Sequence, residues 1–244
     1  MKRLSLAFAI LLLVPGLAAA QSINFDLGNG GGSATARLIQ LTALITLLSL
    51  APSLLVMVTG FTRIVIVLSL LRGAIGAQGT PPNVVLIGLA MFLTYFVMQP
   101  VLDQAWTSGL LPMTEGRIGE LEGMQIAAEP FRKFMADNVK PDDLQLFLDL
   151  AHLPAPAEIG TTPWRALIPG FLVGELRRAF EIGFLLYLPF LAIDMVVASV
   201  LMSLGMMMLP PNVVSLPFKL IFFVLVDGWR LVCGSLVQSF SPSG

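Results

Sequence analysis

Few residues in this chain could carry out nucleophilic, acid–base or metal chemistry. The 244 residues include one cysteine, Cys233, and one histidine, His152. A lone cysteine excludes an intrachain disulfide, and a structural zinc site needs about four Cys or His ligands. A Ser-His-Asp triad would have to use His152, whose Ala-His-Leu-Pro context carries no supporting motif. We therefore predict no catalytic, metal or cofactor site, and we interpret His152 as a loop or helix-end residue.

Charged residues that interrupt apolar segments are the second candidate group. They are Arg63, Asp194, Lys219, Asp227 and Arg230, and Glu175, Arg177, Arg178 and Glu181 come shortly before the third apolar block. A charge at the centre of a bilayer costs about 2.5–3.5 kcal/mol, so such residues are expected to pair, to face water or to contact another subunit.

Helical spacing predicts two local pairs among these charges. Arg177 and Glu181 stand at i,i+4, and Asp227 and Arg230 stand at i,i+3. Three charges, Arg63, Asp194 and Lys219, have no partner at such spacing, and Glu175 could use Arg178 or a more distant cation. Packing between subunits around an aqueous path is the favoured interpretation of Arg63, Asp194 and Asp227, and a proton relay is the alternative.

The composition indicates an integral membrane protein. Hydrophobic residues make up 56% of the chain and charged residues 12%, whereas an ordinary soluble domain carries about 25% charged residues. The net charge of −1 offers no basic field that would suggest a nucleic-acid partner.

The first 20 residues have the pattern of a cleaved signal peptide. Lys2 and Arg3 precede an apolar run over residues 4–14, and three alanines at 18–20 fit a small-residue cleavage site. The alternative is an uncleaved first membrane helix, but the apolar run is shorter than the roughly 20 residues of a comfortable span. The glycine-rich leader at 21–37 lacks the strand and the Lys-Ser/Thr that a phosphate-binding loop needs, so we interpret it as a flexible periplasmic linker.

Four apolar blocks, at 38–71, 84–102, 182–208 and 213–237, predict an all-α membrane protein of two helical hairpins, each with two spans. We divide the mature chain into a first hydrophobic hairpin (38–102), an acidic periplasmic helical segment (103–165) and a second hydrophobic hairpin (166–240). The turns of the two hairpins share a Pro-Pro-Asn-Val-Val repeat at 81–85 and 210–214, preceded at the same offset by Gly76 and Gly205. A helix is expected to end near each glycine and another to begin after each proline pair.

The middle segment differs from the hairpins in charge. Residues 103–165 hold ten acidic and five basic side chains, a net charge of −5, and residues 129–150 form one amphipathic helical stretch. Because cytoplasmic loops favour Lys and Arg, this segment is expected outside the cytoplasm, with both termini. Prolines at 52, 100, 169, 189 and 217 are expected to break or kink the apolar helices, which favours burial in an assembly over straight lipid-facing spans.

The second turn is rich in methionine. It carries Met206, Met207 and Met208 where the first turn has Ala77, Gln78 and Gly79. Methionine is flexible and fills irregular gaps, so in a ring of chains these residues could form a deformable apolar constriction. In a monomer they would be an apolar turn.

Several long segments resemble the FliP family of flagellar type III export-gate proteins, related to the SctR family of injectisomes. They are PSLLVMVTGFTRIVIVLSLLRGAIG (52–76), PPNVVLIGLAMFLTYFVMQPV (81–101), EPFRKFM (129–135) and, most specifically, residues 166–229, from ALIPGFLVGELRRAFEIG to FVLVDGW. The match covers nearly all of the mature chain; the leader and residues 109–125 match least.

The resemblance implies an export gate in the bacterial inner membrane, within the flagellar basal body. About five copies would form a helical ring with FliQ-like and FliR-like subunits, beside FlhA-like and FlhB-like proteins, and unfolded flagellar subunits would pass through it. Met206, Met207 and Met208 match the family's methionine gasket, and Glu175 and Lys219 match a charge pair between neighbouring subunits. The assembly is also implied to rise largely above the membrane plane.

Two other function classes compete with the gate. An autonomous small-solute or proton channel is suggested by Arg63, Asp194 and Lys219. A membrane enzyme is disfavoured, because the sequence contains no nucleophile–base or metal constellation.

Overall fold

The computed structural model divides the chain into two compact units, Met1–Ser49 and Leu50–Gly244. It describes residues 39, 41–42, 45–46, 49, 53, 56–77, 79–154, 156, 159–206 and 208–240. The predicted signal peptide and leader, and Met207, lie outside the described residues. The second unit contains both predicted turns and all of the charged residues that interrupt the apolar segments.

The described part of the second unit is helical and has no strand, which confirms the predicted all-α class. Its elements are α3 (Phe61–Ile75), α4 (Asn83–Ala105), a π-helical turn (Trp106–Leu110), α5 (Leu111–Thr114), α6 (Glu120–Asn138), α7 (Pro141–Leu150), a 3-10 turn (Ile159–Thr161), α8 (Trp164–Ser203), α9 (Pro211–Leu225) and α10 (Gly228–Gln238).

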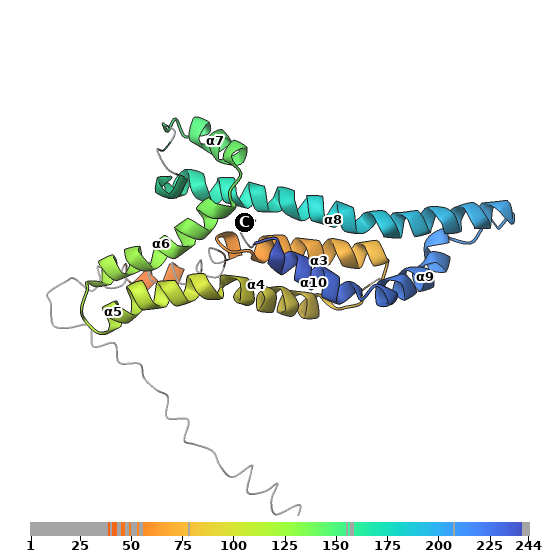
Figure 1. Ribbon diagram of the computed structural model, residues 1–244, viewed down its shortest axis with the longest axis horizontal. Helices are drawn as coiled ribbons and strands as arrows, with labels where there is room; N and C mark the ends of the chain where they lie inside the picture. Colours follow the sequence, from red (N-terminus) through yellow and green to blue (C-terminus); the bar gives the residue numbers. More distant parts are fainter. Residues whose placement is uncertain are drawn as a thin grey trace, which may run out of the picture. The chain divides into compact units, whose positions relative to one another are not determined.

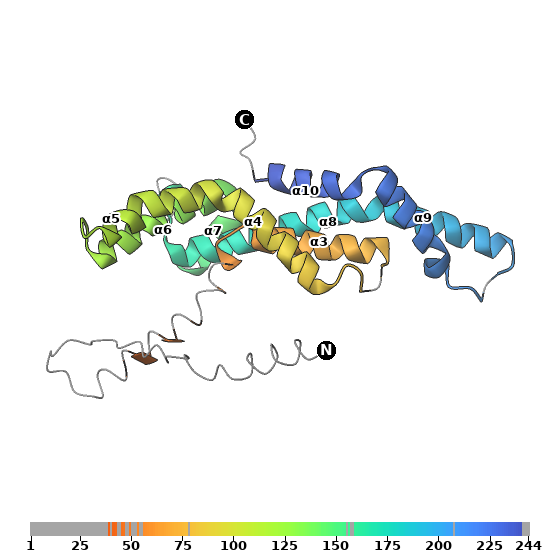
Figure 2. The same cartoon turned by 90° about the horizontal axis from the view of Figure 1, so that it is seen from below.

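Helix α8 organises this unit. Figure 1 shows it running above α3, with α4 and α10 beneath and α7 on its outer side, and it packs against α3, α6, α7 and α9. Figure 2, turned by 90°, shows α6 and α7 beside the first half of α8 and α9 beside its second half. The acidic segment and the second hairpin therefore share one long helix as their support.

By length and composition, two helical stretches could cross a membrane: Asn83–Thr114 and Trp164–Ser203. The bent pair α9 and α10 would make a third if it counts as one span, with 63° between its halves. The expectation of four plain spans is therefore not met among the described residues. Helix α3 is too short, because it has 15 residues and ends at a left-handed glycine, Gly76.

The predicted proline breaks are not found where the structure describes them. Pro100 lies inside α4, Pro217 inside α9, and both Pro169 and Pro189 inside the 40-residue α8. One missing backbone hydrogen bond does not end a helix that is held by its neighbours. The main change of direction lies instead at Asp227, whose φ of 52° separates α9 from α10. Pro52 lies outside the described residues.

The two hairpin turns have the geometry that the repeat predicted. Gly76 (φ 78°) and Gly205 (φ 72°) are left-handed just after α3 and α8. Helix α4 begins at Asn83 and α9 at Pro211, directly after or within the proline pairs. The first turn is also held by Arg72, whose Nη1 donates to Asn83 Oδ1 over 2.5 Å.

The amphipathic stretch at 129–150 is two helices rather than one. Val139 and Lys140 are extended, with ψ of 139° and 138°, and they separate α6 from α7. Pro141 explains the break, because a proline disfavours helical backbone at the preceding residue. The acidic segment thereby folds back, so that α7 lies on α8.

Two apolar clusters form the core. The larger surrounds α3 and includes Ile64, Leu68 and Leu71, and the smaller joins α6, α7 and α8 and includes Met135, Leu148 and Phe171. Phe134 contacts both clusters. Many large apolar side chains stay exposed in the single chain, among them Met91, Phe92 and Phe96 on α4 and Phe184 and Leu185 on α8. Such a surface suits lipid or neighbouring subunits.

Candidate functional site: buried ion pairs and a methionine tip

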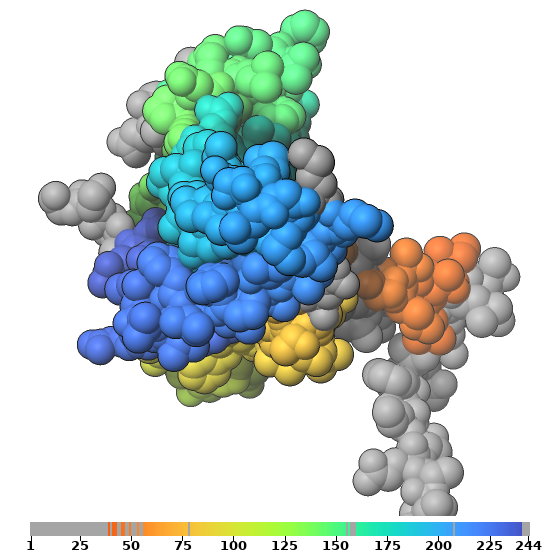
Figure 3. All heavy atoms as spheres, turned by 90° about the vertical axis from the view of Figure 1, so that its right-hand side faces the viewer, coloured from red at the N-terminus to blue at the C-terminus, as the bar shows by residue number. Residues whose placement is uncertain are grey.

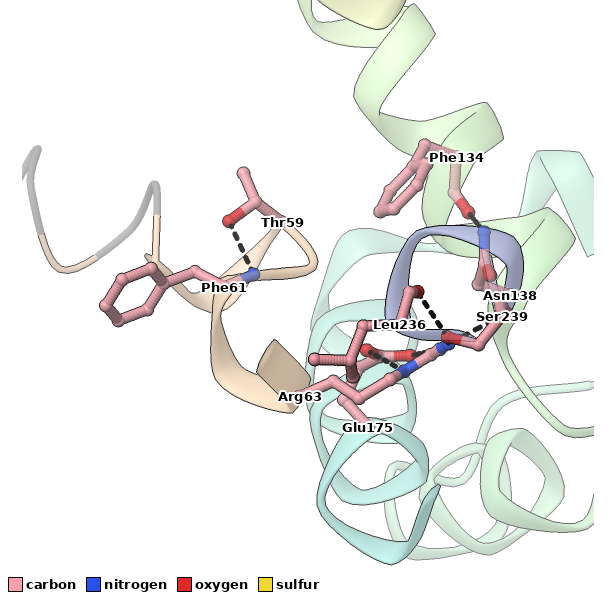
Figure 4. A network of polar contacts seen from close by, with 8 residues as sticks. All are labelled: Thr59, Phe61, Arg63, Phe134, Asn138, Glu175, Leu236 and Ser239. Atoms are coloured by element: carbon pink, nitrogen blue, oxygen red, sulfur yellow. Dashed lines mark hydrogen bonds and ion pairs between the residues drawn. The ribbon is translucent and has the colours of Figure 1, made fainter. Parts of the chain in front are cut away.

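A completely buried ion pair lies at the centre of the unit (Figure 4). Arg63 on α3 and Glu175 on α8 both have 0% exposed side chains. The guanidinium donates from Nε to Glu175 Oε2 over 2.9 Å and from Nη2 to Glu175 Oε1. This two-point geometry matches the fork of an arginine to the two oxygens of a carboxylate.

The last described residues complete this pair. Arg63 Nη1 donates to the backbone oxygen and to Oγ of Ser239, both over 2.9 Å. The ring of Phe240 covers the guanidinium, with its centroid 3.7 Å from Arg63 Cζ. A Cβ on Gly60 would lie 2.6 Å from Phe240 Cζ, so only glycine leaves room for this ring. The C-terminal end of α10 thus closes over the start of α3.

A second ion pair lies near the two turns. Lys219 Nζ on α9 donates to Asp194 Oδ2 on α8 over 2.6 Å and to the carbonyl oxygen of Ala74 on α3 over 3.1 Å. Ser215 Oγ donates to Asp194 Oδ1 over 2.5 Å. The Lys219 side chain is 5% exposed and that of Asp194 28%. Three helices therefore meet at one lysine.

These contacts supply partners that the sequence did not reveal. Arg63, Asp194 and Lys219 have no partner at helical spacing, but each has one on another helix of the same chain. Glu175 uses the distant cation Arg63 rather than Arg178. Within one chain Glu175 and Lys219 have separate partners, and their pairing between subunits stays a prediction. The sequence analysis missed Ser215, Ser239 and Phe240; the only signal of Phe240 was a glycine within an apolar block.

The predicted Arg177–Glu181 pair is wrong. Arg177 instead pairs with Asp143 on α7 over 2.5 Å, and Glu181 pairs with Lys140 over 3.4 Å. Both bonds fasten α7 to α8, and Asp143 is buried. Packing of α7 on this face explains the difference, because it brings two new charges within reach of α8.

The predicted Asp227–Arg230 pair is present, at 3.9 Å. It lies in the open, because the Asp227 side chain is 66% exposed. The expected burial of Asp227 is therefore not produced by the fold of a single chain, and its role in assembly stays a prediction. Surface pairs of this kind contribute little to stability.

The methionine tip, residues 204–210, projects from the far ends of α8 and α9. Figure 3 faces this end of the unit, and α8 and α9, in lighter and darker blue, form its front. Met208 is 98% exposed and Met206 44%. An apolar groove of about 600 Å³, lined by residues such as Val196, Val200 and Phe218, runs between the two helices. The tip is therefore an apolar surface that its own chain does not cover.

The remaining candidates for chemistry offer no site. His152 lies just after α7 with a φ of 53°, which confirms it as a helix-end residue. Cys233 is half-buried on α10. Among the described residues, no group of three or more His, Cys, Asp and Glu side chains could hold a metal ion.

A polar cavity of about 640 Å³ opens beside the Arg63 pair. Lys133, Lys140, Arg178 and Glu181 contribute to its walls, and Ser239 and Phe240 lie at its edge. It joins α4, α6, α8 and the end of α10.

Comparison with known proteins places this architecture in a family. A model of the FliP family matches residues 44–236. The flagellar biosynthetic protein FliP of Caulobacter vibrioides is 56% identical over 229 residues, which cover 93% of this chain and 86% of that protein. The protein of the same name from Agrobacterium fabrum is 48% identical over 99% of this chain and all of that protein, and that from Bacillus subtilis is 48% identical over 83% of this chain and 91% of that protein. With buried ion pairs between apolar helices, an exposed methionine tip and this level of identity over nearly its whole length, the chain belongs to the FliP family.

Proposed function

We propose that this chain is a pore-forming subunit of the flagellar type III protein export gate, which conducts unfolded flagellar subunits across the bacterial inner membrane during flagellum assembly. The observation that carries the proposal is the methionine tip: three adjacent methionines at the end of a helical hairpin, two of them described and both exposed. The relatives' name, flagellar biosynthetic protein, supports the flagellar context.

The proposed gate is a homo-oligomer of about five chains with FliQ-like and FliR-like subunits. FlhA-like and FlhB-like export proteins lie beside it, and both termini of each chain are periplasmic. The exposed apolar faces of α4 and α8 support contact with other subunits or with lipid, because a monomer in water would leave them uncovered. In a ring, the tips of neighbouring chains would meet. Flexible methionine side chains suit such a seal, since they can close against ions and still yield to a polypeptide of any sequence.

Replacing the three tip methionines tests this function. Met206→Ala, Met207→Ala and Met208→Ala together should leave the amount of assembled complex unchanged and raise the ion conductance of the membrane. The matched control is Met124→Ala, because Met124 is also exposed but lies on α6, away from the tip. Unchanged conductance in the triple variant, with normal assembly, would remove the constriction from the proposal.

The proposed inter-subunit pair has its own test. Glu175→Lys should impair ring assembly, and adding Lys219→Glu should restore it in part if the two residues meet between subunits. The intrachain contacts of Glu175 with Arg63 and of Lys219 with Asp194 make the opposite outcome equally sharp. If the double variant is worse than either single one, the two residues act through their partners within the chain.

The alternative of an autonomous channel loses its motivation in this structure. Arg63, Asp194 and Lys219 suggested it because they lacked partners, and all three have partners within the chain. A native mass measured with and without the FliQ-like and FliR-like neighbours separates the two functions. A multimer that captures them supports the gate, whereas a monomer in both cases supports the channel.

A further inference from the structure

We propose that Asp194, Ser215 and Lys219 form a brace that holds the methionine tip in place and couples it to the turn between α3 and α4. The idea rests on the proposed function for its biological meaning, but its physical content concerns only how one chain is held together. Residues 76–82 are called the first tip, and residues 204–210 remain the methionine tip.

The brace joins the two helices from which the methionine tip projects. Asp194 lies on the last part of α8, which ends at Ser203, and Ser215 and Lys219 lie on the first turns of α9, which begins at Pro211. Asp194 Oδ1 accepts from Ser215 Oγ over 2.5 Å and its Oδ2 accepts from Lys219 Nζ over 2.6 Å. Both carboxylate oxygens of α8 are thus bonded to α9. Between this point and the tip lies the apolar groove of about 600 Å³, so the helices are not closely packed along their whole length.

The same lysine connects α9 to the first tip. Ala74, whose carbonyl oxygen accepts from Lys219 Nζ over 3.1 Å, is the second-last residue of α3. Carbonyl groups in the last turn of a helix lack an intrahelical partner and attract cations. A Cβ on Gly76 would lie 3.9 Å from Nζ, which places the lysine directly beside the start of the first tip.

Loss of the lysine should therefore loosen both tips rather than one. Lys219 Nζ uses two of its three hydrogens in these bonds. Without it, Asp194 keeps only Ser215, and the end of α3 loses its contact with α9. A displaced first tip and a displaced methionine tip are then two results of one broken contact.

Hydrogen exchange of the full-length protein in detergent tests the brace without requiring transport. Lys219→Met should speed backbone exchange in both tips by about ten- to a hundredfold, the range that the loss of a hydrogen bond to a charged group gives. Exchange over α6 and α7 should stay unchanged, because neither helix contacts the brace. The control is Arg230→Met, which removes an exposed cation from α10. Faster exchange confined to α9, or a first tip that exchanges as in the wild type, would overturn the coupling.

A charge swap separates the two arms of the brace. In Asp194→Lys with Lys219→Asp, the bond between α8 and α9 can form again, but residue 219 can no longer donate to the Ala74 carbonyl. The methionine tip should recover its protection and the first tip should not. Recovery of both tips or of neither would contradict the assigned contacts. Ion conductance after replacement of Met206–Met208 tests the gate separately, so the brace and the gate can fail independently.

Discussion

The buried pair of Arg63 and Glu175 gives the most direct test of the structure. Removing one partner of a buried ion pair leaves an uncompensated charge and typically costs about 3–5 kcal/mol. Arg63→Met also removes the donor for the Ser239 carbonyl and hydroxyl oxygens. Both side chains are 0% exposed, so water cannot replace the lost contacts without opening the core.

The expected loss can be measured as a shift in thermal midpoint. For a domain of this size about 1 kcal/mol corresponds to about 2–4 °C, so Arg63→Met and Glu175→Gln should each lower the midpoint by about 6–20 °C. Reaction of the half-buried Cys233 thiol with a maleimide dye on heating reports unfolding of the detergent-solubilised chain.

The double variant Arg63→Met with Glu175→Met gives the decisive comparison. It leaves no unpaired charge, and only the oxygens of Ser239 lose a partner, which costs about 1–3 kcal/mol. It should therefore be more stable than either single variant. Arg230→Met, which removes an exposed cation, should change the midpoint little. If the costs of the two single variants simply add, the two residues do not form the isolated pair that the structure shows.

Two further changes test the packing around this pair and of α7. Gly60→Ala should destabilise the protein by about 1–3 kcal/mol through overpacking against Phe240, whereas Gly73→Ala, with open space in α3, should stabilise it by up to about 1 kcal/mol; equal effects in thermal unfolding would contradict this assignment. Arg177→Met leaves the buried Asp143 without its cation, so limited proteolysis should cut near α7 sooner while α3 and α10 stay protected. Unchanged cleavage would show that the ion pair does not hold α7.

Local sequence signals predicted much of this fold. Helical class follows from apolar composition and turn residues, and both turns have the expected glycine and proline geometry, because φ preferences act within a few residues. The Asp227–Arg230 pair was also predictable, since i,i+3 spacing brings two side chains to one helix face. The methionine tip was visible as an apolar run between two helices, and Met206 and Met208 are exposed.

Signals that depend on packing between helices were misread or missed. The Arg177–Glu181 pair fails because α7 folds back onto α8 and offers Asp143 and Lys140 instead. That fold-back depends on the break before Pro141, which an amphipathic pattern over 129–150 does not reveal. Four separate spans were expected from hydropathy, but α3 is short and the last apolar block bends by 63° at a left-handed aspartate.

Sequence alone determined that this is an apolar helical protein with two similar turns, an acidic middle and charges that must find partners. Only the tertiary structure decided which partners those are. Arg63 meets Glu175 across 112 positions of sequence, and Lys219 meets Asp194 and Ala74 across 25 and 145. Periodicity can pair residues one turn apart on a helix, but it contains no information about which faces of separate helices pack together, and that packing sets the distances over which buried charges interact.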